Sequence, residues 1–262
     1  MSSSSPSRRR VYLMRHGAVD YFLPDGTPLR SDRVRLSVAG VREAHAAGAL
    51  FAACGVRFDR AVTSGLPRTV QTAQQVLRAC GAALPIEEEA ALIEIRSAAA
   101  LEESRSDAGL EKSRRAVALE ESRPGDPAPG RVELAFLGAF LPGKDVEAQR
   151  FGDGESIGEL LDRVLPPFGA WLARDDWRTL LLVLHSAVNR ALLSTALVGE
   201  RAFFGRMEQQ PGCINVLDVG RSLAPRGDAR VRAIGLAPSQ WLEAPGHRTM
   251  DELLAHYEPA TV

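Results

Sequence analysis

Two short apolar runs in this chain each end on a histidine. The first run is Val11–Met14, followed by Arg15 and His16, and the second is Leu180–Leu184, followed by His185. A continuous apolar run of this length is typical of a strand that is buried on both faces of a sheet. Ligands of open α/β sheets bind just beyond the carboxyl ends of such strands. The pattern therefore predicts that both imidazoles lie in one site, and the nearby arginines favour a phosphate as its ligand.

Hydrophobic periodicity and capping residues predict alternating helices and strands along much of the chain. The expected elements are a helix from the N-cap Ser37 to about Ala53, a strand over 60–63, a helix from about Pro67 to about Ala79, a helix after the capping-box residue Ser156, and late strands over 214–219 and 230–236. We expect Pro166 and Pro167 to kink or divide the helix that follows Ser156. Alternation of this kind implies right-handed crossovers. We therefore predict an α/β fold, a three-layer sandwich with a mainly parallel central sheet, helices on both faces and a helical cap insertion.

The domain organisation is expected to be simple, with one interruption. Residues 1–10 form a Ser/Arg-rich leader, and residues 11–262 form a single domain with a cap insertion at about 96–150. A Leu-Glu-x-Ser-Arg unit recurs within the insertion at a spacing of nine residues. Nine residues rotate by half a circle in a helix, so the repeated leucines do not share a face, which argues against a coiled coil. We interpret the segment as a solvated, low-complexity helical insertion that covers the site.

Composition limits the classes of partner that we expect this protein to bind. The chain has 262 residues and a net charge of −1, which gives no support for binding to nucleic acid or to an anionic membrane. No apolar stretch reaches the length of a membrane helix, about 18 residues. Cys54, Cys80 and Cys213 are odd in number and form no CxxC pair, which suggests reduced thiols and a cytoplasmic location. The sequence does not decide the oligomeric state, and a homodimer is one of the alternatives.

The candidate chemistry is phosphoryl transfer. His16 is the candidate nucleophile, because an imidazole nitrogen can accept a phosphoryl group covalently. Arg15 and Arg68 carry forked donors that match the oxygens of a phosphate. Gly17 is expected to let the backbone approach the anion, and His185 is expected to donate to it. Arg190 could support the site or lie on a helix surface, and we assign it no catalytic role.

Four motifs, read with their neighbours, resemble those of the histidine phosphatase superfamily, the phosphoglycerate mutase-like group. The matching stretches are Leu13-Met14-Arg15-His16-Gly17, Leu36-Ser37-Val38-Ala39-Gly40, Thr63-Ser64-Gly65-Leu66-Pro67-Arg68-Thr69-Val70-Gln71-Thr72-Ala73 and Leu184-His185-Ser186-Ala187-Val188-Asn189-Arg190. The stretch from Phe151 to Ser156 also resembles the family's glycine-glutamate-serine segment. The resemblance covers residues 11–95 and 151–220.

The resemblance implies a phosphohistidine at His16, with Arg15, Arg68 and His185 holding the phosphoryl group. It also implies that neither a metal nor another cofactor is required. In the mutase-like branch a glutamate after the third strand is the proton donor, and Glu94 occupies the similar position. Ser186 stands where the family usually has glycine, so its hydroxyl is a further candidate phosphate ligand or a source of crowding.

We therefore expect a metal-independent hydrolase that acts on a small phosphomonoester. Two alternatives remain at this point. In a mutase, the phosphoenzyme returns its phosphoryl group to a bound product. In a non-catalytic member, the pocket binds phosphate without turnover, as Ser186 and the altered cap segment suggest.

Overall fold

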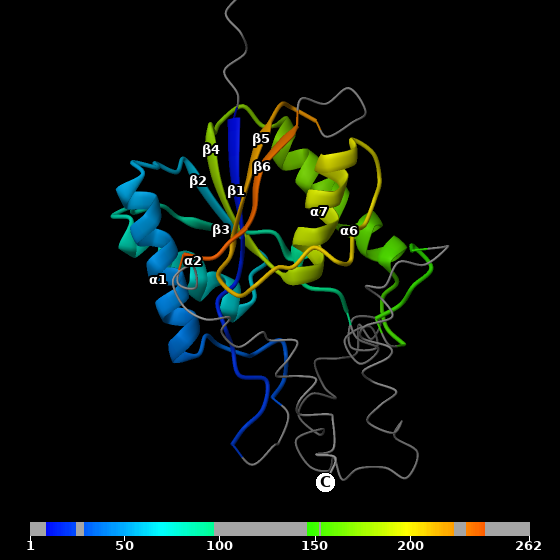
Figure 1. Ribbon diagram of the computed structural model, residues 1–262, viewed down its shortest axis with the longest axis horizontal. Coiled ribbons are helices and arrows are strands. Elements are labelled where there is room, and N and C mark those ends of the chain that lie inside the picture. The colour runs from blue at the N-terminus through cyan, green and yellow to red at the C-terminus, as the bar shows by residue number, and fades with distance from the viewer. Residues whose placement is uncertain (1–8, 25–28, 97–145, 152, 223–228, 239–262) are drawn as a thin grey trace, which may run out of the picture.

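The protein, described here by a computed structural model, is built on one six-stranded sheet (Figure 1). The structure describes residues 9–24, 29–96, 146–151, 153–222 and 229–238. The strand order is β3-β2-β4-β1-β5-β6. The strands are β1 (Arg9–Arg15), β2 (Arg60–Thr63), β3 (Ile86–Glu88), β4 (Thr179–Leu184), β5 (Ile214–Val219) and β6 (Arg230–Leu236). Strands β1 to β4 run parallel, whereas β5 is antiparallel to both of its neighbours. The predicted α/β fold with a mainly parallel sheet is confirmed.

Helices cover both faces of the sheet, because successive residues of the central strands point to opposite sides. On one face, Met14 and Val183 pack in a core with α1 (Val38–Ala53) and α2 (Pro67–Ala79). On the other face, Leu13 and Leu182 pack in a second core with α6 (Ile157–Ala173) and α7 (Ser186–Val198). Figure 1 shows the two helix pairs on opposite sides of the strands. The apolar runs of β1 and β4 are therefore buried on both faces, as predicted.

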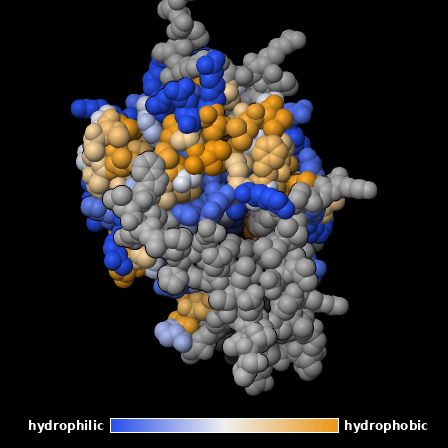
Figure 2. All heavy atoms as spheres, in the orientation of Figure 1, coloured by the Kyte–Doolittle hydropathy of each residue, from blue (hydrophilic) through white to orange (hydrophobic). Residues whose placement is uncertain are grey.

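The edge strand β6 differs from the central strands. Its side chains are exposed or half-buried along its whole length. Figure 2 shows apolar residues gathered over this part of the surface.

None of the helices in the described ranges is long and apolar enough to cross a membrane.

The parallel strands bring the ends of the sequence motifs to one edge of the sheet. In the register of β1 with β4, Arg15 pairs with Leu184, and in that of β2 with β4, Thr63 pairs with Val183. The next residues along these three strands therefore emerge side by side. A short 3-10 helix, η1 (Ala90–Leu92), follows β3 towards the same region.

Two sequence predictions about local structure are wrong. The leader ends earlier than expected, because Arg9 and Arg10 belong to β1. Arg9 is buried, donates to the carbonyl oxygens of Leu172 and Gly220 at 2.5 Å each, and lies 4.4 Å from the ring centroid of Trp177. These partners lie far along the chain, so a local pattern could not reveal them.

The proline pair does not divide α6. The helix runs from Ile157 to Ala173 and contains both Pro166 and Pro167. Its Ser156 capping box forms as predicted, with Glu159 as the partner. Apolar residues before and after the prolines are buried in the same core, among them Leu160 and Phe168. This packing keeps the helix continuous across the two missing N–H groups. The kink that the sequence offers as the other outcome stays a prediction. The predicted cap insertion at about 96–150 falls mostly on residues 97–145, which lie outside the described part.

Substitution of Gly40 is expected to destabilise the fold, because α1 packs on the loop after β1 without space for a side chain. A Cβ atom at Gly40 would lie 2.1 Å from the oxygen of Ala18. We expect Gly40→Ala to lower the free energy of unfolding, measured by urea titration, by about 1–3 kcal/mol or more. Gly169 within α6 is the matched control, since among the described residues nothing lies within 4 Å of its Cβ position. Gly169→Ala should instead raise stability by about 0.5–1 kcal/mol, and equal losses in both variants would contradict this explanation.

Candidate active site

His16 follows β1 directly and is fixed by its own backbone. Its N–H donates to Leu184 O at 2.9 Å, and its carbonyl accepts from Gly212 N at 3.0 Å. Its ring Nδ1 lies 2.8 Å from Gly17 O. A carbonyl oxygen only accepts, so Nδ1 carries the proton and Nε2 keeps its lone pair. Burial lowers the pKa of His16 well below its usual value, and the charges of Arg68 and Arg15 lower it further. His16 is therefore a neutral imidazole with a nucleophilic Nε2.

His185 follows β4 and lies beside His16. The ring centroids of His16 and His185 are 5.3 Å apart, and His185 is fully buried. Its Nδ1 lies 3.4 Å from Nη2 of Arg68, and its Nε2 lies 2.8 Å from Oγ of Ser64. A guanidinium only donates, so Nδ1 holds a lone pair and Nε2 carries the proton. The two apolar runs thus end in one site, as their pattern predicts.

A chain of hydroxyl groups supports this assignment of the His185 protons. Ser64 Oγ accepts from His185 Nε2–H, so the Ser64 hydroxyl is available to donate to Thr69 Oγ1 at 3.1 Å. Thr69 in turn donates to Leu66 O at 2.8 Å. Ser64 was missed as a site residue from the sequence. Its place directly after β2 is the signal that could have found it, since β2 ends at the same sheet edge.

Arg15 and Arg68 bring positive charge to the two imidazoles. Arg15 Nη1 donates to Gln209 O at 2.6 Å, and Arg68 Nη1 donates to Ser31 O at 2.5 Å. Both side chains are anchored on carbonyl groups and are buried. In the described part of the chain, the buried Nε of each arginine has no hydrogen-bond partner. Buried donors in this state are rare in proteins and suit an anionic ligand.

Gly17 and Ser186 each make a contact within the protein. The Gly17 amide donates to Thr72 Oγ1 at 3.0 Å, and a Cβ atom at Gly17 would lie 2.5 Å from Gly40 O. The contact with α1 therefore gives a packing reason for this glycine. Ser186 is the first residue of α7, and its Oγ accepts a hydrogen bond from Nη1 of Arg190. Their contact with phosphate stays a prediction.

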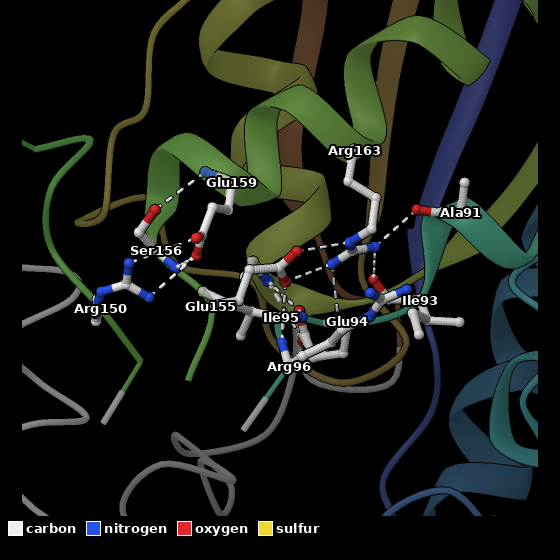
Figure 3. A network of polar contacts seen from close by, with 11 residues as sticks. Ala91, Ile93, Glu94, Ile95, Arg96, Arg150, Glu155, Ser156, Glu159 and Arg163 are labelled. Atoms are coloured by element: carbon white, nitrogen blue, oxygen red, sulfur yellow. Dashed lines mark hydrogen bonds and ion pairs between the residues drawn. The ribbon is translucent and has the colours of Figure 1, made fainter. Parts of the chain in front are cut away.

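Glu94 reaches the same site from the loop after η1. Its Oε1 accepts from Ala187 N at 3.1 Å and from Ile95 N at 3.0 Å. Ala187 is the second residue of α7, so the carboxyl lies at the positive end of that helix, next to His185. Figure 3 shows Glu94 among the polar contacts that surround its loop. The structure thus brings the candidate acid to the candidate phosphate site.

Arg190 belongs to the same charged cluster. Burial, together with the charge of Arg15, lowers the pKa of Arg190 to about 10, while Glu94 acts in the opposite direction. The described residues contain no group of three or more histidine, cysteine, aspartate or glutamate side chains that could hold a metal ion. The arrangement can bind a dianion, attack it with an imidazole and place a carboxyl group beside it.

The two buried imidazoles are expected to make folding sensitive to pH. Burial lowers the pKa of both His16 and His185, whereas in the unfolded chain both titrate near 6.5. Below that pH the unfolded state therefore binds more protons than the folded state, and stability falls as the pH falls. Two such groups contribute a slope of up to about 2.7 kcal/mol per pH unit below pH 6.5.

Chemical denaturation between pH 7.5 and 5.5 measures this slope. His16→Gln and His185→Gln should each reduce the slope by about one proton, or about 1.4 kcal/mol per pH unit. His45 is exposed on α1, and its replacement by glutamine should leave the slope unchanged. A wild-type slope that neither buried-histidine variant reduces would show that other groups cause it.

Comparisons with known proteins identify the family of this chain. The sequence matches the histidine phosphatase superfamily (branch 1) over residues 11–224. Similar solved structures include an α-ribazole phosphatase from Shigella flexneri, with 20% identity and a TM-score of 0.57 over 86% of this chain and 96% of that chain. A mycobacterial glucosyl-3-phosphoglycerate phosphatase with inorganic phosphate has 20% identity and a TM-score of 0.56 over 88% and 98%. A phosphoglycerate mutase from Bacillus anthracis str. Sterne has 14% identity and a TM-score of 0.58 over 96% and 97%.

At these identities the solved structures show the shared fold. No curated protein matches the sequence. The family match spans most of the chain and includes every residue that the sequence motifs nominate for the site. The chain therefore belongs to branch 1 of the histidine phosphatase superfamily.

Proposed function

We propose that the protein hydrolyses a small phosphomonoester through a phosphohistidine at Nε2 of His16. The observation that carries the proposal is the orientation of this imidazole. Its Nδ1–H is held by Gly17 O, so Nε2 is the unprotonated nitrogen and keeps its lone pair, while His185, Arg15 and Arg68 lie around the same site. A neutral nitrogen nucleophile beside fixed positive charges is what phosphoryl transfer requires.

The first half-reaction forms an N–P bond and breaks the ester P–O bond. His16 Nε2 attacks phosphorus while the carboxyl of Glu94 gives its proton to the leaving alkoxide. Arg15 and Arg68 compensate the charge on the non-bridging oxygens of the phosphoryl group. The neutral His185 has its Nδ1 beside Arg68, so it can donate to an oxygen only after Nδ1 takes up a proton.

The second half-reaction returns the enzyme to its starting state. The Glu94 carboxylate takes a proton from water, the water oxygen attacks phosphorus, and the N–P bond breaks. Inorganic phosphate leaves, and His16 is again a neutral imidazole. Each proton that Glu94 donates in the first step is thus recovered in the second. This cycle uses no metal ion.

A phosphate-release screen with a phosphoenzyme trap tests the proposal. The screen covers sugar phosphates, phosphoglycerates, nucleotides and phosphoamino acids, with and without a chelator. We expect steady phosphate release from at least one class, unchanged by the chelator, inhibition by vanadate that is competitive, and a phosphoenzyme that is labile in acid and stable in alkali. Phosphate release without such an intermediate would contradict the covalent route, and release only with an added bisphosphorylated sugar acid would favour a mutase.

A further inference from the structure

The loop that carries Glu94 is held by one arginine of α6. Arg163 Nη1 donates to Ala91 O at 2.7 Å and to Ile93 O at 2.9 Å, and its Nη2 donates to Glu94 O at 3.2 Å. Figure 3 shows this side chain reaching from the helix towards the three carbonyl groups. Carbonyls of a loop converge on one donor group only in a defined backbone conformation. The guanidinium therefore fixes the backbone on which the Glu94 side chain is mounted.

Glu155 holds the other side of the same arginine. Its Oε1 accepts from Arg163 Nε at 2.7 Å and its Oε2 accepts from Nη2 at 2.6 Å, which makes a bidentate pair. The side chains of Arg163 and Glu155 are only 11% and 4% exposed. Glu155 also accepts from Arg96 N at 3.0 Å and donates its own N–H to Arg96 O at 2.8 Å. The loop is thus fixed on both sides of Glu94.

Arg163 has no donor to spare for another role. A guanidinium has five N–H groups, and Arg163 makes five hydrogen bonds, two to Glu155 and three to loop carbonyls. Lysine has three donors on one nitrogen and cannot reproduce this fork. The guanidinium contacts the backbone of the loop, whereas the Glu94 carboxyl binds Ala187 N. Besides burial, the charge of Arg163 also reaches His185 and helps to lower its pKa.

We propose that Arg163, oriented by Glu155, is a positioning residue that sets the Glu94 carboxyl for proton transfer to the leaving group. We call the pair of Arg163 and Glu155 the clamp. The proposal rests on the proposed function, because it assigns the clamp to the acid step of that reaction. A proton donor is effective only within hydrogen-bond reach of the atom that it protonates. Displacement of the loop should therefore slow the step that needs the proton and leave phosphate binding intact.

Leaving groups of different acidity separate this role from a general loss of structure. An alkyl phosphate needs protonation of its leaving oxygen, whereas the anion of p-nitrophenol leaves without it. The experiment measures single-turnover phosphoenzyme formation with both substrates for Arg163→Lys and Glu155→Gln. We expect a loss of about 10²-fold for the alkyl ester, at the low end of the usual range for acid catalysis, and much less, about 5-fold at most, for p-nitrophenyl phosphate. Vanadate affinity should stay within about 3-fold of wild type, because Arg15, Arg68 and both histidines are untouched.

The matched control is Arg201→Lys. Arg201 also binds α6, through Gly158 O and Asp162, but it is exposed and contacts no residue of the Glu94 loop in the described part. This variant should keep wild-type rates with both substrates. Three results would overturn the proposal and leave Arg163 and Glu155 with a structural role alone. The first is an equal loss of rate on both substrates, and the second is no loss of rate in either clamp variant. The third is a loss of vanadate affinity in both variants that parallels the loss of rate. Failure of the proposed function would be distinguished by a wild-type enzyme that forms no phosphoenzyme with either substrate.

Discussion

Replacement of His16 by alanine is expected to reduce phosphate release by at least about 10⁴-fold, since the variant lacks the only group that the reaction bonds to phosphorus. The imidazole is buried, neutral and oriented with Nε2 unprotonated, so no neighbour can take its place without rebuilding the site. Steady-state phosphate release and acid-quench trapping with the best substrate of the screen measure the effect. The trapped phosphoenzyme should disappear together with turnover.

His45→Ala is the control for this experiment. His45 is exposed on α1, so its removal should leave both turnover and the phosphoenzyme unchanged. Vanadate binding to the His16→Ala protein should persist, because Arg15 and Arg68 are anchored elsewhere, on Gln209 O and Ser31 O. Full activity of the His16→Ala protein would refute the covalent route.

Glu94→Gln is expected to lower turnover of alkyl phosphates by about 10²–10⁴-fold. Glutamine retains the size of the side chain and can still accept from Ala187 N, as the carboxylate does. It cannot give up or take a proton, however, so both half-reactions slow. The pH profile of turnover and the rate for p-nitrophenyl phosphate are measured alongside, and phosphoenzyme formation from the aryl ester should suffer least.

Glu89→Gln provides the comparison within the same acidic stretch. Glu89 precedes η1 and makes no side-chain capping bond there, so its conversion to an amide should change turnover by less than about 2-fold. If Glu94→Gln retained wild-type rates on alkyl phosphates, the proton donor would have to be another residue, and the clamp by Arg163 would lose its proposed purpose.

Local sequence signals predicted the elements that position the site. Ser37, Pro67 and the Ser156–Glu159 capping box mark helix starts that the structure confirms. The apolar runs before His16 and His185 predicted buried strands that end at one site, and the structure places the two strands side by side in the sheet. These signals work because a cap or a continuous apolar run depends on residues close in the chain.

Contacts between distant segments were not predictable in the same way. The buried place of Arg9 depends on carbonyls near residues 172 and 220, and the continuity of α6 through Pro166 depends on the core beneath it. The five bonds of Arg163 likewise require α6 to lie beside the loop after η1. An arginine in an amphipathic helix is usually exposed, so nothing in its neighbours distinguishes this one.

The anchoring of Arg15 and Arg68 on carbonyl groups has a consequence for the protein in the cell. Neither guanidinium is paired with a carboxylate within the described residues, so folding brings together like charges that no direct ion pair neutralises there. A bound oxyanion supplies the missing counter-charge and binds only the folded form, which shifts the folding equilibrium by mass action. Under the proposed function, we therefore expect the phosphate that the enzyme releases to stabilise the folded enzyme itself.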